Sequence, residues 1–134
     1  METEPLDDDK IRFWYATFLA DRCICQYCGF DGGQSPEHWV QLQGDHLIPK
    51  KPAAEFAEDS LNRVTACYYC NTQKSNFDPA EGRFRQVASL DVRRELIEKT
   101  REYLKQKKAN IWREGGGLRA SYEHMMQRIR DKTG

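Results

Sequence analysis

The residues with the clearest chemical potential are cysteines that occur in two pairs with the same internal spacing. Cys25 and Cys28 form one C-x-x-C pair, and Cys67 and Cys70 form the other. A structural zinc ion takes four ligands in a tetrahedron, and each C-x-x-C turn offers two sulfurs from one tight loop. The spacing therefore predicts a single four-cysteine site that holds a structural zinc ion.

Two other interpretations of the cysteine pairs stay open at this point. The pairs could be redox-active dithiols, although the thioredoxin-like βαβ pattern that accompanies such dithiols is missing. A zinc module could also be the whole function, as in a binding domain without catalysis. Cys23 lies too close to Cys25 for the usual metal-binding turn, and we expect it to be a packed or partly exposed free thiol.

The segment between and just after the pairs contains side chains that could do further chemistry. Asp45 and His46 are adjacent, Asn62 follows, and Asn71 comes directly after the last cysteine. Taken singly these are weak signals. A lone Asp-His is more often a surface or hydrogen-bonded pair, and a lone loop Asn is usually a turn or cap residue.

Together, and in this order, these residues form a compound pattern. It resembles the zinc-containing, four-cysteine branch of the HNH (ββα-metal) endonuclease family. The resembling stretch runs from Cys25 to about Asn76 and reads C-x2-C-G, then D-H-x-x-P, then L-N-x-V-x-x-C-x2-C-N-x2-K. The resemblance implies a core of two strands and a helix that grips one divalent ion. It also implies metal-dependent hydrolysis of phosphodiester bonds in DNA.

The resemblance assigns a role to each matching residue. Asp45 is expected to bind the catalytic ion and His46 to act as the general base. Asn62 would orient His46 through its amide or its backbone carbonyl. Asn71, which stands where many members have His, would be the second ligand of the ion.

The chemistry of these residue types fits the implied reaction. Imidazole can accept a proton from water near neutral pH. Carboxylate and amide oxygens suit a hard cation such as Mg2+ or Mn2+, which would stabilise charge on the phosphate and the leaving oxygen. Lys74, one helical turn beyond Asn71, and Arg63 are further candidates for contacts with a substrate phosphate. The alternative for Lys74 is a solvated helix lysine.

The elements that must position these residues follow from local patterns. Apolar residues at helical spacing predict an N-terminal helix from about residue 6 to 21, with its stripe packed on the core. Residues 38–43 and 45–48 read as two short strands around Gly44. A short helix should open between Asn71 and Asn76.

The C-terminal part of the chain is helical by pattern. Ser89 or Asp91 can cap a long helix that ends at the glycine break of residues 115–117. Residues 118–130 suggest a last helix.

These elements combine into an expected α+β fold. It has a ββα-metal (HNH) core held by the four-cysteine zinc site, with an N-terminal helix and C-terminal helices. We expect one domain over residues 1–134. Its parts are an N-terminal helix (1–22), the zinc-bound core (23–78) and a basic helical extension (79–134).

The distribution of charge bears on partners. The net charge is zero, but residues 1–81 carry 7 Lys or Arg and 14 Asp or Glu, whereas residues 82–134 carry 14 and 7. A basic C-terminal half suits DNA, although solvated helices are often rich in Lys and Arg for no such reason. A homodimer is an open conjecture.

Composition also bears on location and on rival functions. The sequence has no apolar run of membrane-spanning length, and the acidic start METEPLDDDK fits no signal peptide. We therefore expect a cytoplasmic protein with no membrane partner. The rivals to a DNA endonuclease are a non-catalytic zinc module that binds nucleic acid or protein, and an RNA-directed nuclease.

Overall fold

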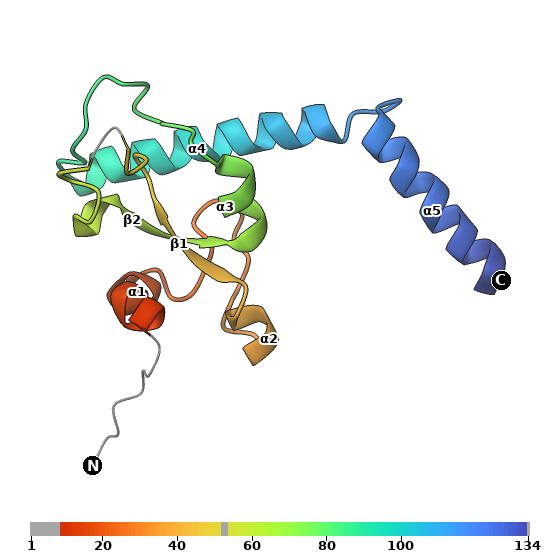
Figure 1. The fold of residues 1–134 in the computed structure, drawn as a ribbon, viewed down its shortest axis with the longest axis horizontal. Helices are drawn as coiled ribbons and strands as arrows, with labels where there is room; N and C mark the ends of the chain where they lie inside the picture. The colour runs from red at the N-terminus through yellow and green to blue at the C-terminus, as the bar shows by residue number, and fades with distance from the viewer. Residues whose placement is uncertain (1–8, 52–53, 134) are drawn as a thin grey trace, which may run out of the picture.

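The computed structural model describes residues 9–51 and 54–133, which form helices around a two-stranded antiparallel sheet (Figure 1). This architecture confirms the expected α+β class. No helix in the described part of the chain is long and apolar enough to cross a membrane. The elements in chain order are α1 (Asp9–Ala20), α2 (Pro36–Trp39), β1 (Leu42–His46), the 3-10 turn η1 (Ser60–Asn62), β2 (Arg63–Cys67), α3 (Tyr68–Lys74), α4 (Leu90–Ile111) and α5 (Gly117–Thr133).

The sheet pairs two strands that are distant in sequence. In its register Leu42 lies opposite Cys67, and His46 lies opposite Arg63. Helix α3 follows β2 without a loop, so the two strands and this helix make the expected ββα unit. The helix begins at Tyr68, inside the second C-x-x-C pair, and so starts earlier than the predicted Asn71.

The predicted pair of strands at 38–43 and 45–48 is wrong. Residues 36–39 form the short helix α2, because the Ser35 hydroxyl accepts a hydrogen bond from the His38 backbone N–H and Pro36 occupies the first turn. Gly44 does not divide two strands but lies within β1. A Cβ atom at Gly44 would lie 2.0 Å from the Trp14 ring, so the glycine allows α1 to pack closely on the strand.

Helix α1 covers one face of the sheet through a narrow apolar stripe. Trp14 and Phe18 are buried against Leu42. Tyr15 and Leu19 are exposed, so the expectation that the whole stripe packs on the core is corrected. The predicted start at residue 6 lies outside the described residues.

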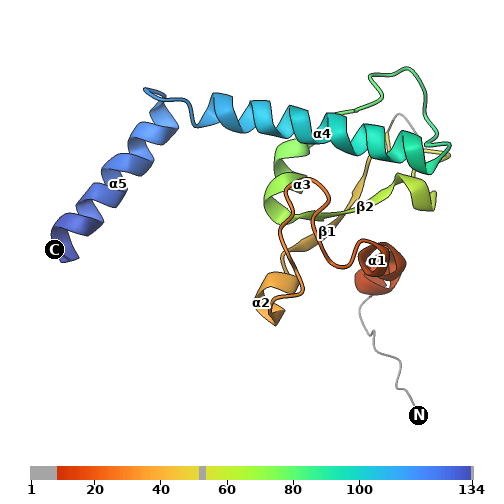
Figure 2. The same ribbon diagram turned by 180° about the vertical axis from the view of Figure 1, so that it is seen from behind.

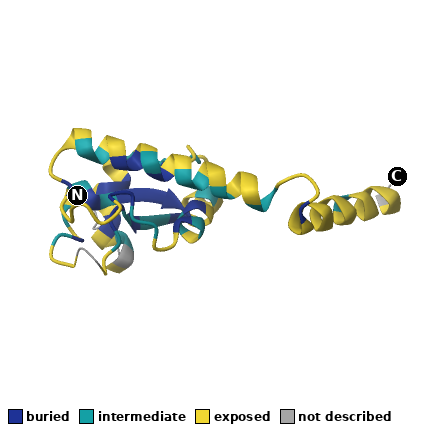
Figure 3. Cartoon of the chain, turned by 90° about the horizontal axis from the view of Figure 1, so that it is seen from above, coloured by how far each residue is buried: buried dark blue, intermediate teal, exposed yellow. Residues whose placement is uncertain are grey.

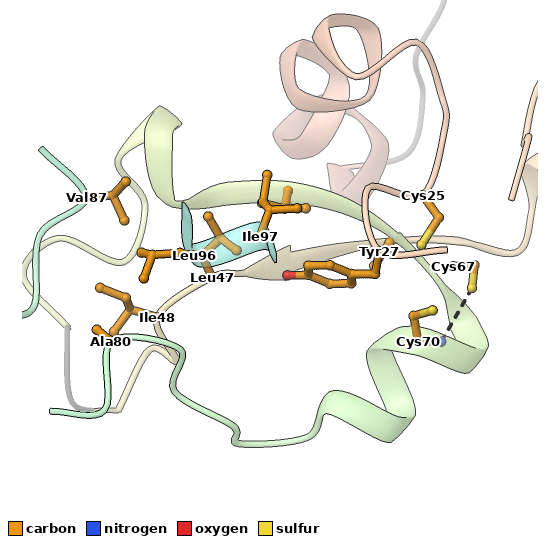
Figure 4. Packing of buried hydrophobic residues seen from close by; sticks show 12 residues of the cluster. Cys25, Tyr27, Leu47, Ile48, Cys67, Cys70, Ala80, Val87, Leu96 and Ile97 are labelled. Atoms are coloured by element: carbon orange, nitrogen blue, oxygen red, sulfur yellow. Dashed lines mark hydrogen bonds between the residues drawn. The ribbon is translucent and has the colours of Figure 1, made fainter. Parts of the chain in front are cut away.

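The main core lies on the other side of the sheet, under α4. Leu47 and Ile48, which follow β1, pack with Val64 of β2 and with Leu96 and Ile97 of α4. Figure 4 shows Leu47, Ile48 and Leu96 on one side of the Tyr27 ring and the labelled cysteines on the other. The hydrophobic core and the predicted metal site are therefore parts of one cluster.

The long helix α4 is tied to the rest of the molecule by a partly buried ion pair. Arg93 Nη2 lies 3.3 Å from Asp21 Oδ1 at the end of α1, and it also donates to the backbone carbonyl of Arg63. The Ser89 hydroxyl accepts a hydrogen bond from the Val92 N–H, which confirms the predicted cap. The helix ends at Ile111, shortly before the glycine break.

Helix α5 projects away from the sheet and its covering helices (Figures 1 and 2). Its surface is almost entirely exposed, in contrast to the inner face of α4 (Figure 3). The Tyr122 ring packs edge-on against Trp112 in the connection from α4, with ring centroids 5.8 Å apart.

Candidate metal centre and active site

The four cysteines of the two C-x-x-C pairs lie together. Their sulfur atoms are all within 4.8 Å of one another, and Cys28 Sγ lies 3.7 Å from Cys67 Sγ. A zinc ion with Zn–S bonds of about 2.3 Å holds its tetrahedral thiolates about 3.8 Å apart. Cys25, Cys67 and Cys70 are buried and Cys28 is exposed. The cluster is thus compatible with the predicted structural zinc.

Local backbone structure places these sulfur atoms. Gly29 has φ of 81°, which closes the first turn after Cys28 and lets the Gly29 N–H donate to the Cys25 carbonyl. Cys67 ends β2 and caps α3, with its sulfur accepting from the Cys70 N–H (Figure 4). The Gln26 N–H donates to the Thr65 carbonyl and so joins the first turn to the sheet.

Hydrogen bonds within the cluster favour the thiolate form of Cys25. Hydrogen bonds from the thiols of Cys67 and Cys70 lower the pKa of Cys25 to about 2. The hydrogen bond that Cys67 makes to Cys25 raises the pKa of Cys67 to about 11. A second hydrogen bond to Cys25, with one to Cys67, raises the pKa of Cys70. Zinc binding must therefore displace protons from Cys67 and Cys70.

Asp45 is a buried carboxylate beside this cluster. The Tyr27 hydroxyl donates to Asp45 Oδ2 at 2.6 Å, and Lys74 Nζ lies 3.2 Å from the same oxygen. Burial, followed by the charge of Asp45, raises the pKa of Tyr27 well above its ordinary value. The phenol therefore remains a hydrogen-bond donor at neutral pH. Within the described residues both contacts fall on Oδ2, which leaves Oδ1 as the oxygen to offer an ion.

Lys74 differs from both expectations drawn from the sequence. Its side chain is 1% exposed, and Nζ donates to the His46 carbonyl at 2.9 Å. Burial lowers the pKa of Lys74, and the neighbouring Asp45 opposes that shift. The residue is neither a solvated lysine nor placed to contact a substrate phosphate. The face of α3 that carries it packs on the sheet, and its charge meets the buried carboxylate there.

His46 ends β1 and is partly exposed. Its Nε2 lies 2.6 Å from Glu58 Oε1, and its ring centroid lies 5.3 Å from that of Trp14. Burial tends to raise the pKa of Glu58, but the hydrogen bond and charge of His46, with Arg63 and Lys50, lower it overall. Sequence reasoning missed Glu58, which lies in an irregular segment where no spacing links it to His46.

Asn62 is fully buried and holds backbone groups. Its Oδ1 accepts from the Ile48 N–H, and its Nδ2 donates to the carbonyls of Ile48 and Ala57. Its own carbonyl accepts from the Leu47 N–H. The amide and the carbonyl of Asn62 are therefore bonded to the main chain beside His46 and not to its ring, and the role of orienting His46 stays a prediction. Asn62 fixes the chain just after His46 and just before Glu58.

The Arg63 side chain contacts other residues of the chain, Phe13 and Glu58. Its guanidinium carbon lies 4.0 Å from the centre of the Phe13 ring, and Nη1 donates to the Phe13 carbonyl. Nε lies 3.6 Å from Glu58 Oε1. In place of the expected phosphate contact, the structure gives Arg63 the role of joining α1 to Glu58.

The residues expected to bind a divalent cation, Asp45 and Asn71, both carry oxygen donors. Asn71 is half-buried in α3 and lies three residues before Lys74, so the two share one side of the helix. Lys74 contacts Asp45, so Asn71 lies one helical turn from that contact, and its role as an ion ligand stays a prediction. A carboxylate and an amide oxygen are ligands that Mg2+ and Mn2+ accept while keeping positions for water.

Comparison with known proteins bears on the core of the chain. Residues 25–77 match the family model described as HNH endonuclease. The matched range coincides with the stretch of the sequence that resembles this family, and so confirms the resemblance. Neither the curated proteins nor the solved structures contain a match to the chain.

Proposed function

We propose, on the premise that residues 25–77 form an HNH endonuclease domain, that this protein is a metal-dependent endonuclease acting on DNA. One observation carries the proposal. A buried carboxylate, Asp45, and an accessible imidazole, His46, are adjacent at the end of β1, and each is held by its own partners. Such a pair offers an ion ligand and a base within one site.

Each residue then has a defined task. Asp45 and Asn71 would hold the divalent ion, which would supply positive charge to stabilise the phosphate and the leaving oxygen. Tyr27 and Lys74 fix the Asp45 carboxylate from one side. His46 accepts a proton from the attacking water. The four-cysteine site would hold a structural zinc ion that takes no part in the reaction, and its two cysteine pairs lie on either side of Asp45 and His46 in the sequence.

The C-terminal helices supply the positive surface for the substrate. Exposed basic residues on α4 and α5 include Arg94, Arg101, Lys105, Lys108, Arg119 and Arg128. Contacts of such residues with phosphates release counterions, so binding to DNA should weaken steeply as salt rises. The salt dependence should be the same for DNA of any base sequence, because the contacts are to phosphates.

The test is cleavage of supercoiled plasmid by purified, zinc-loaded protein with Mg2+, Mn2+ or EDTA. Nicking or linearisation that needs the ion is expected, and His46→Ala should abolish it. The matched control is His38→Ala, which removes a histidine of α2 that lies outside the site. If folded protein with one zinc cuts no substrate with either ion, the chain is a non-catalytic zinc module. Cleavage of RNA alone would instead indicate an RNA-directed nuclease.

A further inference from the structure

Glu58 is the residue in closest contact with the proposed base. Its Oε1 lies 2.6 Å from His46 Nε2, although the two residues come from different segments of the chain. The carboxylate is also held by cations, since Arg63 Nε lies 3.6 Å from Oε1 and Lys50 Nζ lies 4.0 Å from Oε2. An isolated surface ion pair would lack this surrounding set of contacts.

The contact determines which nitrogen of His46 carries a proton. An ionised carboxylate is only an acceptor of hydrogen bonds, so Nε2 must be the donor. In a neutral imidazole the other nitrogen, Nδ1, then has a free electron pair. The Trp14 ring packs beside the imidazole, with centroids 5.3 Å apart and planes inclined by 59°, and limits its rotation.

The backbone that carries Glu58 is itself fixed. The buried Asn62 amide donates to the carbonyl of Ala57, the residue just before Glu58. The same side chain makes two hydrogen bonds to Ile48, two residues after His46. One asparagine therefore ties together the two segments that bring Glu58 and His46 into contact.

We propose that Glu58 is a positioning residue that holds His46 with Nε2 protonated, so that Nδ1 accepts the proton of the attacking water. Asn62 acts on His46 through Glu58 and not by direct contact. The inference rests on the proposed function for its catalytic meaning. The tautomer that it requires can be measured without any cleavage.

The first experiment is 15N NMR of the imidazoles in zinc-loaded protein, with the His46 signals assigned by their loss in His46→Ala. The neutral form is reached by raising the pH until the shifts no longer change. In the wild type, Nε2 should give the shift of a protonated nitrogen and Nδ1 that of an unprotonated one. Glu58→Ala should give a mixture of tautomers, while Glu58→Gln, whose amide oxygen can still accept, should retain the wild-type form.

The matched control is Glu55→Gln. Glu55 lies in the same segment, and its exposed carboxylate pairs with Arg85 and not with His46. Glu55→Gln should leave the His46 spectrum unchanged. Zinc content and circular dichroism establish that each variant is folded, and Glu58→Gln still tests the contact if Glu58→Ala does not fold. Wild-type protein with Nε2 unprotonated, or Glu58→Ala with an unchanged tautomer, would overturn the proposal.

Cleavage kinetics provide the second measurement. Glu58→Ala should lower kcat by roughly 10- to 100-fold with little change in KM, and Glu58→Gln should recover part of the loss. Equal kcat in Glu58→Ala and wild type would overturn the positioning role. If the wild type has the expected tautomer but cuts no nucleic acid, the proposed function fails while the Glu58 contact stands.

Discussion

At the scale of single residues, the Tyr27 hydroxyl is one of the partners that hold the buried Asp45 carboxylate. Tyr27→Phe deletes a 2.6 Å hydrogen bond to a buried carboxylate and keeps the ring. We expect the free energy of unfolding to fall by about 1.5–3 kcal/mol, as for hydrogen bonds to charged groups. Denaturant unfolding measures the loss. Tyr15→Phe, at an exposed tyrosine of α1, is the control and should change stability little. Equal stabilities of Tyr27→Phe and the wild type would show that the hydroxyl contributes nothing.

The Glu58 carboxylate should make the stability of the protein depend on pH in the acidic range. Its pKa is lowered from 4.5 in the folded state by His46, Arg63 and Lys50, against the opposing effect of burial. The unfolded chain therefore binds more protons in this range, so the stabilisation is present above pH 4.5 and is lost as pH falls through the folded pKa. Stability curves of the wild type and Glu58→Gln should converge on acidification. Curves that stay parallel would contradict the prediction, and Glu55→Gln provides the comparison for an exposed carboxylate.

The candidate site residues that the sequence predicts lie in a motif, whereas those that it does not predict are linked to the site only by contacts in the fold. The cysteines, Asp45 and His46 stand in a motif whose order and spacing are visible along the chain. Glu58 and Tyr27 act through contacts that only the folded chain creates. Lys74 was misjudged because helical spacing gives its side of α3 but not whether that side is covered.

At the scale of elements, Gly44 decides how closely α1 approaches the sheet. A Cβ atom there would lie 2.0 Å from the Trp14 ring, a distance that requires the helix or strand to move. Gly44→Ala should destabilise the protein by about 1–3 kcal/mol through overpacking. Thermal unfolding measures this change. Gly117→Ala is the control, because a Cβ at Gly117 meets nothing within 4 Å. An unaltered melting temperature for Gly44→Ala would refute the close approach.

The same glycine explains why the strands were misread. The sequence predicts two short strands, 38–43 and 45–48, around Gly44. In the fold the strand continues through Gly44 and pairs with Arg63–Cys67, which lies beyond a long loop. Predictions that depend only on neighbouring residues agree with the structure more closely. The Ser89 cap of α4 depends only on neighbouring residues, and it was among the predicted caps.

At the scale of the whole molecule, the four-cysteine cluster and the core are one unit. The first C-x-x-C pair lies before β1, and the second joins β2 to α3, so the cysteines enclose Asp45 and His46. The main core contains Cys25, Cys67 and Cys70 beside Tyr27. The order of the motif predicted this enclosure. The direction in which α5 projects had no sequence signal, because it depends on the short connection around Trp112.

Loss of zinc should therefore unfold the core as a whole. The sheet has two strands, and a small core of this kind gains much of its stability from a structural metal, for which binding is worth about 10–16 kcal/mol in zinc-finger peptides. Cys25→Ser removes one ligand and should abolish zinc binding and cooperative unfolding, as followed by metal analysis and circular dichroism. Cys23→Ser is the matched control, two residues away and outside the four-sulfur cluster, and it should keep one zinc. A Cys25→Ser variant that keeps both zinc and a wild-type melting transition would show that the cluster is not what holds the ββα unit together.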